Sequence, residues 1–114
     1  MKSVEIDPAI EADPVLASSV ARAHELFEAK YGRSSASVSA RWHLLHDDLG
    51  RPLIRLVISD PDGIAEAVFR PEDLDDAHRV MYRLIWVWGD LLQAQSHKLI
   101  EEIKAGSTAG SVGA

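Results

Sequence analysis

The chain of 114 residues contains no cysteine, and this absence excludes disulfides, thiolate metal ligands and cysteine catalysis. Long apolar runs are absent as well. The first residues, MKSVEIDPAIEADP, lack the apolar core of a signal peptide, and no run approaches the roughly 20 residues of a membrane span. By elimination, these absences favour a cytoplasmic protein that has no membrane partner.

The sequence also lacks a Gly-rich phosphate loop, a nucleophile elbow and the ligand spacing of a zinc site. His43 and His46 lie in a stretch that alternates like a β-strand. Their side chains should therefore point to opposite faces, and they cannot share one metal ion without a bulge between them. We expect no metal and no cofactor, and no motif indicates an enzyme.

Positive charge is scarce, with 12 Lys and Arg against 18 Asp and Glu and a formal net charge of −6. Nucleic acids and anionic membranes are bound by clustered Lys and Arg, so this balance disfavours both as partners. Hydrophobic residues make up 46% of the chain and charged residues 26%, which is ordinary for a globular protein. The length suffices for one hydrophobic core.

The longest pattern covers residues 71–104 and predicts a single helix. Pro71 suits the first helical position, and acidic residues crowd the first turns, where the helix dipole favours them. Gly89 followed by Asp90 offers an alternative end, a glycine stop before an aspartate cap. The apolar spacing keeps its phase across Gly89, however, so a continuous helix is favoured.

This helix has a stripe of residues at the spacing of a buried face. The stripe consists of Leu74, Ala77, Met81, Leu84, Trp88, Leu91, Gln95, Leu99 and Ile103. Residues 84–88, LIWVW, are apolar on every side, so Trp86 and Val87 are expected to point away from the stripe and to need a second cover.

Length also indicates that the helix is only partly covered. A helix over residues 72–103 is about 48 Å long, whereas the strands predicted below are each about 20 Å long. We expect the uncovered part to meet a second copy of the chain. The predicted homodimer interface contains Trp86, Val87, Leu91 and Leu92.

The rest of the chain predicts one more helix and three strands. Asp13 followed by Pro14 is a suitable cap and first residue for a helix over residues 14–31. Alternating apolar residues, separated by the turn sequences DLGRP and DPDG, then predict β-strands. The predicted strands are residues 38–47, 53–59 and 64–69.

The predicted fold is therefore α+β with two layers and the element order α-β-β-β-α. A three-stranded antiparallel meander packs against an N-terminal helix and a long C-terminal helix. Residues 14–104 form this single domain, and residues 105–114 form a small, polar, flexible tail. Residues 1–13 are predicted to be an irregular N-terminal arm, with a short edge strand at SVEI as the alternative.

Double-stranded-RNA-binding domains have the same element order, and they place a basic N-terminus of the last helix on phosphates. This sequence departs from that pattern where the contact would form. Its long helix begins with Glu72, Asp73, Asp75 and Asp76. We therefore expect no nucleic-acid partner.

Strand pairing is predicted by keeping the apolar residues on one face of the sheet. Pairing Asp47 with Leu53, and Ser59 with Ile64, achieves this in both hairpins. The opposite, open face of the sheet then carries an acid, a base and two guanidiniums. These candidate ligand-binding residues are Arg41, His43, Arg55 and Glu66, with His43 and Glu66 in one cross-strand row.

Two functions compete for these features. The leading hypothesis is a small, acidic, non-enzymatic protein-interaction module that acts as a homodimer through its long C-terminal helix and binds another protein. The alternative is a small-ligand or anion-binding protein, or a minor enzyme, that uses the open sheet face. A flat sheet is a poor pocket, and cross-strand charge pairing explains the same residues, so the alternative ranks second.

Overall fold

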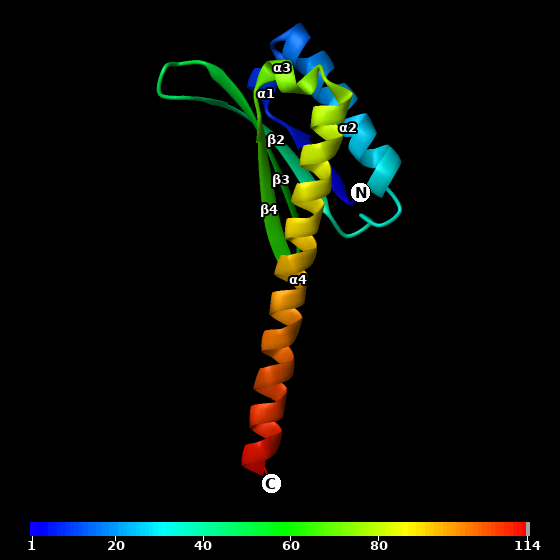
Figure 1. The fold of residues 1–114 in the computed structure, drawn as a ribbon, viewed down its shortest axis with the longest axis vertical. Helices are drawn as coiled ribbons and strands as arrows, with labels where there is room; N and C mark the ends of the chain where they lie inside the picture. Colours follow the sequence, from blue (N-terminus) through cyan, green and yellow to red (C-terminus); the bar gives the residue numbers. More distant parts are fainter. Residues whose placement is uncertain (114) are drawn as a thin grey trace.

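The computed structural model describes residues 1–104 in full and residues 105–113 as helical backbone. The flexible tail expected over residues 105–114 therefore falls outside the residues whose side chains are described. Figure 1 shows helices α2 (Pro14–Tyr31) and α4 (Ala77–Gly113) lying against a sheet, and α4 running far past the end of that sheet. The chain thus has the predicted α+β fold, with a four-stranded sheet in place of three strands.

An aspartate cap explains where α2 begins. Asp13 accepts the backbone N–H groups of Val15 and Leu16 at the start of α2, directly before Pro14. The elements in chain order are β1 (Ser3–Ile6), α1 (Pro8–Glu11), α2 (Pro14–Tyr31), β2 (Ser39–His46), β3 (Pro52–Asp60), β4 (Gly63–Phe69), α3 (Pro71–Leu74) and α4 (Ala77–Gly113).

The irregular arm preferred over residues 1–13 is wrong, and the alternative, a short edge strand at SVEI, is what the structure has. Strand β1 pairs parallel with β2 at one edge of the sheet, whose order is β1-β2-β3-β4, and Ile10 of α1 is fully buried. Asp7 secures this segment, because its carboxylate accepts the N–H of Leu44 and its own N–H donates to the carbonyl of Trp42. A four-residue strand with three exposed positions carries too little alternation to favour the strand over an irregular arm.

The two hairpins differ in how well their register was predicted. Between β3 and β4, Ser59 pairs with Ile64, as predicted, because the two-residue turn fixes the register. Between β2 and β3 the prediction is wrong by two residues: Leu45, not Asp47, faces Leu53. The same side chains still share a face, since a shift of two residues preserves sidedness.

The loop between β2 and β3 explains the shift. Asp47 begins the loop instead of ending the strand, because its carboxylate accepts the backbone N–H groups of Leu49 and Arg51. These hydrogen bonds lower the pKa of Asp47, with the bond from Arg51 the largest cause. Gly50 completes the loop at φ 76°, in the left-handed region that glycine tolerates.

The single helix predicted over residues 71–104 is interrupted near its start, not at Gly89. Helix α3 ends at Leu74, and the carboxylate of Asp76 caps a new helix by accepting the N–H groups of His78 and Arg79. Asp75, between the two helices, accepts hydrogen bonds from Ser19 and Arg22 of α2, each at 2.9 Å. Helix α4 then passes through Gly89 without a break.

The core lies between the sheet and helices α2 and α4. Phe27 of α2, Trp42 of β2 and Phe69 of β4 are among its largest fully buried side chains. On α4, the buried positions are Val80, Leu84, Val87 and Leu91. The buried face of α4 is therefore rotated about the helix axis relative to the predicted stripe. Of the residues in that stripe, Met81 and Trp88 are only partly buried, and Leu99 and Ile103 are exposed.

Trp88 reaches the boundary between the two helices. Its indole stacks on the ring of Tyr31 from α2, with centroids 4.6 Å apart and planes inclined by 15°. Phe27 meets the same indole edge-on at 6.0 Å. These aromatic contacts hold α2 beside α4, which leaves the side of α4 opposite the sheet uncovered.

Candidate interaction surfaces

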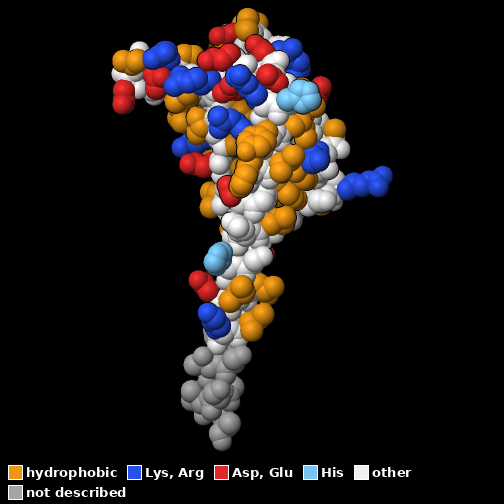
Figure 2. All heavy atoms as spheres, viewed as in Figure 1, with side chains coloured by type: hydrophobic (Ala, Val, Ile, Leu, Met, Phe, Trp, Pro, Cys, Tyr) orange, Lys and Arg blue, Asp and Glu red, His pale blue; other side chains and the backbone are white. Residues whose placement is uncertain are grey.

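The outer face of α4, opposite the sheet, is rich in exposed apolar side chains. This face is defined by Tyr82, Ile85, Trp86, Leu92, Leu99, Ile100 and Ile103. Trp86 is 61% exposed and Leu92 is 46% exposed, and the ring of Tyr82 meets that of Trp86 edge-on at 6.2 Å. Figure 2 shows hydrophobic side chains over the upper part of the helix and again lower down, just before the grey atoms.

The predicted interface residues divide into two groups. Trp86 and Leu92 lie on the outer face, as an interface requires. Val87 and Leu91 do not lie on this face. They are 1% and 0% exposed within this chain's own core, so they cannot contribute to an interface on the outer face, contrary to the prediction. The side of α4 that they occupy packs against β4, where Ala65 and Ala67 leave room for the helix.

The last part of α4 extends beyond the sheet. The turn between β3 and β4 contacts the helix through Gln95, which donates to the Asp60 carboxylate, and through Lys98, which donates to the Pro61 carbonyl at 3.1 Å. We call α4 beyond Lys98 the overhang. Its described apolar side chains, Leu99, Ile100 and Ile103, are all exposed.

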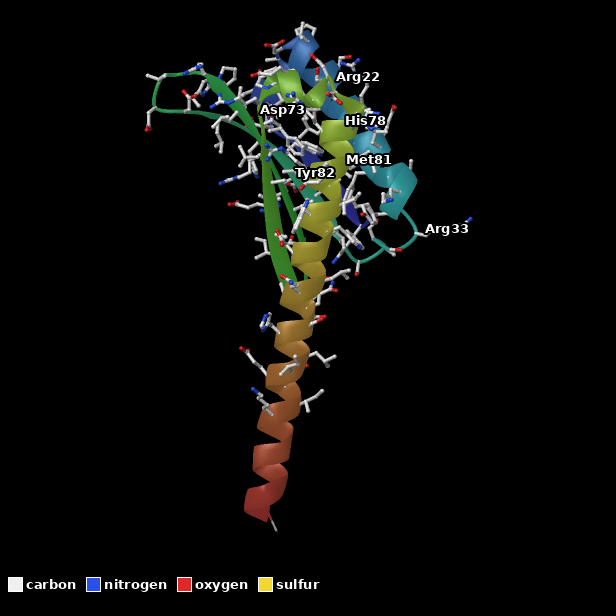
Figure 3. The ribbon with its side chains drawn as sticks, in the orientation of Figure 1. Arg22, Arg33, Asp73, His78, Met81 and Tyr82 are labelled. Carbon is white, nitrogen blue, oxygen red and sulfur yellow. The ribbon has the colours of Figure 1, made fainter. Side chains whose placement is uncertain are left out.

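A groove lies between β4 and α4, and sequence analysis did not predict it. The groove has a volume of about 750 Å³ and is lined by Val68 of β4 and by Arg79, Tyr82, Arg83 and Trp86 of α4, among others. In Figure 3, Asp73, His78 and Tyr82, which also line it, follow one another from α3 down α4. Its existence depends on where the helix crosses an edge strand, which spacing in the sequence does not reveal.

The charges of this groove are already partly paired. Asp73 accepts a hydrogen bond from Arg79 Nη1 at 3.0 Å and from the backbone N–H of Arg70. Burial raises the pKa of Asp73, but these hydrogen bonds and the nearby guanidiniums, including that of Arg83, outweigh burial and leave the pKa lowered. Arg83 itself lies over the ring of Phe69, at 5.8 Å from its centroid.

The open sheet face brings together the four candidate ligand-binding residues, in rows that differ from the prediction. Arg41 shares a row with Val57 and Glu66, whereas His43 pairs with Arg55. Arg55 Nη1 lies 4.0 Å from Glu66 Oε2, and Arg41 Nε lies 3.8 Å from Glu5 Oε2 on β1. Each guanidinium thus has a nearby carboxylate, which is the ordinary pairing of a solvated sheet face.

Two details of this face bear on ligand binding. Arg55 Nε is buried and has no hydrogen-bond partner among the described residues. A hollow of about 320 Å³ adjoins Arg41 and His43, but Glu5 and Asp7 line it too. Two carboxylates at the rim of the hollow oppose an anion there.

Comparisons with protein-family models, with curated proteins and with solved structures found no match to this chain. Among residues 1–104, no group of three or more His, Asp or Glu side chains is placed to hold a metal ion. Over the same described part, no helix combines the length and the apolar character that crossing a membrane requires. The assignment of a function therefore rests on the surfaces described above.

Proposed function

We propose that this chain is a non-enzymatic protein-interaction module that acts as a homodimer through the outer face of α4. The observation that supports the proposal is the set of seven large apolar side chains exposed along that single helix, from Tyr82 to Ile103. A monomer seldom exposes so many large apolar side chains along one helix face, and large exposed apolar patches mark protein–protein contacts.

The aromatic pair on this face supports the same proposal. Tyr82 and Trp86 are both more than half exposed and meet edge-on. Tryptophan and tyrosine are over-represented among the residues that contribute most to binding at interfaces. A two-fold symmetric pairing would cover the pair in both copies and leave no unpaired apolar surface. We further propose that the dimer binds another protein. We also propose that it works in the cytoplasm, because a chain without cysteine forms no disulfides and so does not depend on an oxidising compartment.

The homodimer is tested by sedimentation velocity on the wild type and on two variants, Trp86→Glu and Leu92→Glu. We expect the wild type to be dimeric at tens of micromolar and each variant to weaken the dimer at least tenfold, because a buried charge is costly. Val15→Glu is the matched control, since Val15 is exposed on α2 and lies off the outer face. A wild type that stays monomeric at these concentrations would refute the homodimer.

Anion binding at the open sheet face is the second candidate, supported by the buried, unpaired Nε of Arg55. The test is a titration of the protein with inorganic phosphate, in which the NMR chemical shifts of the β2 and β3 backbone amides are measured at each phosphate concentration. Saturable shifts around Arg55 that Arg55→Gln removes would support this candidate. Shifts that scale with ionic strength alone, in the variant as in the wild type, would rule it out.

A further inference from the structure

The outer face of α4 contains a heptad seam. Starting at Tyr82, positions on this face recur at alternating intervals of three and four residues, which is the spacing of a two-helix coiled coil. The seam consists of Tyr82, Ile85, Gly89, Leu92, Ser96, Leu99 and Ile103. Its middle is open, because a Cβ placed on Gly89 would meet no atom within 4 Å.

Side chains of different size alternate along the central part of this seam. Ile85, Leu92 and Leu99 are large, whereas the positions between them, Gly89 and Ser96, are small. Two parallel helices in register would place Gly89 on Gly89 and Ser96 on Ser96, leaving both of these layers underfilled. Unfilled space between packed helices forfeits dispersion contacts and destabilises the interface.

An antiparallel pair fills the same space. The seam alternates between two sets of positions: Tyr82, Gly89, Ser96 and Ile103 form one set, and Ile85, Leu92 and Leu99 form the other. In an antiparallel coiled coil, a residue of one set meets a residue of the other set across the interface. Gly89 then faces Leu92 of the second copy, and Ser96 faces Ile85. Each small residue thus receives a large one, at the density that protein interiors require. The outermost layer places Tyr82 against Leu99.

We infer that two copies of this chain pack their α4 helices antiparallel along this seam, with the overhang of each copy seated on the Tyr82 end of the other. The inference rests on the proposed homodimer and adds its direction and register. Leu99, Ile100 and Ile103, the described apolar side chains beyond Lys98, are all exposed. Exposed apolar side chains gathered on one helix face mark a contact with a partner, so a partner along this part of α4 is expected.

The available area agrees with a second copy as the occupant. The layers from Tyr82 to Leu99 span about 26 Å of helix. Aromatic side chains such as Tyr82 and Trp86 bury about 150–250 Å² each when fully covered. Scaled by their exposure, the seven apolar residues of the outer face offer on the order of 600 Å² per copy, at the lower limit of the about 600–1,000 Å² per partner that stable interfaces bury.

The test uses single cysteines, which the chain otherwise lacks. Tyr82→Cys and Leu99→Cys are prepared separately, one of them with an affinity tag to give it a distinct mass, and are oxidised alone and as a mixture. Disulfides form only when the two Cα atoms lie within about 7 Å. The antiparallel register therefore predicts a mixed cross-linked dimer from the mixture and no more self-cross-linking than in Glu25→Cys, a control on α2.

The outcomes separate this inference from the proposed homodimer. Strong self-cross-linking of Leu99→Cys, with no mixed product, would mean parallel helices: the inference fails and the homodimer stands. A dimeric mass without any cross-link would place the interface away from the seam, for example at the free edge of β4, and also overturns the inference. Monomeric wild type and no cross-link would overturn both.

Discussion

Trp42 donates its indole N–H to Nδ1 of His24 across 3.3 Å, which joins β2 to α2 at the edge of the core. Neutral His24 accepts this bond and keeps its own proton on Nε2, which lies 3.5 Å from Glu28 Oε1. Burial lowers the pKa of His24 below its ordinary value, although Glu28 opposes the shift. Protonation of Nδ1 would remove the acceptor that Trp42 uses.

This arrangement predicts that stability depends on pH. The unfolded chain, with a His pKa of about 6.5, binds the proton more readily than the folded one. Stability is therefore complete above about pH 6.5 and is lost as the pH falls through the lower pKa of the folded state. Urea midpoints at pH 7.5 and 5.5 measure the loss. His24→Gln should reduce the difference between the two urea midpoints. The control His97→Gln, on the exposed part of α4, should leave that difference as in the wild type.

Two glycines should respond to alanine in opposite directions. In the monomer, at dilute concentration, Gly89→Ala is expected to raise the free energy of unfolding by about 0.5–1 kcal/mol, because it improves helix propensity and its Cβ meets no atom of the same chain within 4 Å. Gly63→Ala should lower it, since the new Cβ would lie 2.9 Å from the Cβ of Ala94. Urea unfolding of both variants measures the difference, and a loss of stability in Gly89→Ala would contradict the open surroundings of that residue.

Neighbouring leucines on α4 should separate folding from assembly. Leu91→Ala is expected to cost about 2–5 kcal/mol, because the side chain is fully buried. Leu92→Ala should change the stability of the monomer by less than about 0.5 kcal/mol and weaken the dimer. Denaturation at dilute concentration measures the first effect and sedimentation the second. Equal losses of monomer stability would mean that Leu92 is as buried in the monomer as Leu91.

The start of α4 should depend on its cap. Asp76→Ala removes the acceptor for the N–H groups of His78 and Arg79 and should cost about 1 kcal/mol. Asp90→Ala, an exposed position within the same helix, is the control and should stay within about 0.5 kcal/mol of the wild type. Thermal unfolding followed by circular dichroism compares them, and equal melting temperatures would show that the cap contributes nothing.

Local signals predicted much of this fold. Asp13 and Pro14 marked the start of α2, and the two-residue turn before Gly63 set the register of β3 with β4. The interruption of the long helix was missed because Asp76 was interpreted as a charge near a helix dipole, whereas it caps a second helix. The two interpretations predict the same residue type at the same place, so spacing alone does not separate them.

The side of α4 that faces the sheet was harder to predict, and Val87 and Leu91 were assigned to the interface for this reason, although both are buried. Between Leu84 and Trp88 the helix is apolar on every side, so the hydrophobic period does not say which side faces the sheet. The sheet decides it, by placing Ala65 and Ala67 under Val87 and its neighbours. The outer seam from Tyr82 to Ile103 was nevertheless present in the sequence, as a second heptad spacing beside the one that was chosen.

The hydrogen bonds of Asp75 with Ser19 and Arg22 have a mechanical consequence. These bonds hold Asp75 just before the start of α4, a 37-residue helix that is about 55 Å long. A rotation of roughly 5° at that start would swing the far end by about 5 Å, nearly one helical turn. The two polar side chains of α2 therefore set the direction of α4 together with Gln95 and Lys98, which hold the same helix to the turn between β3 and β4.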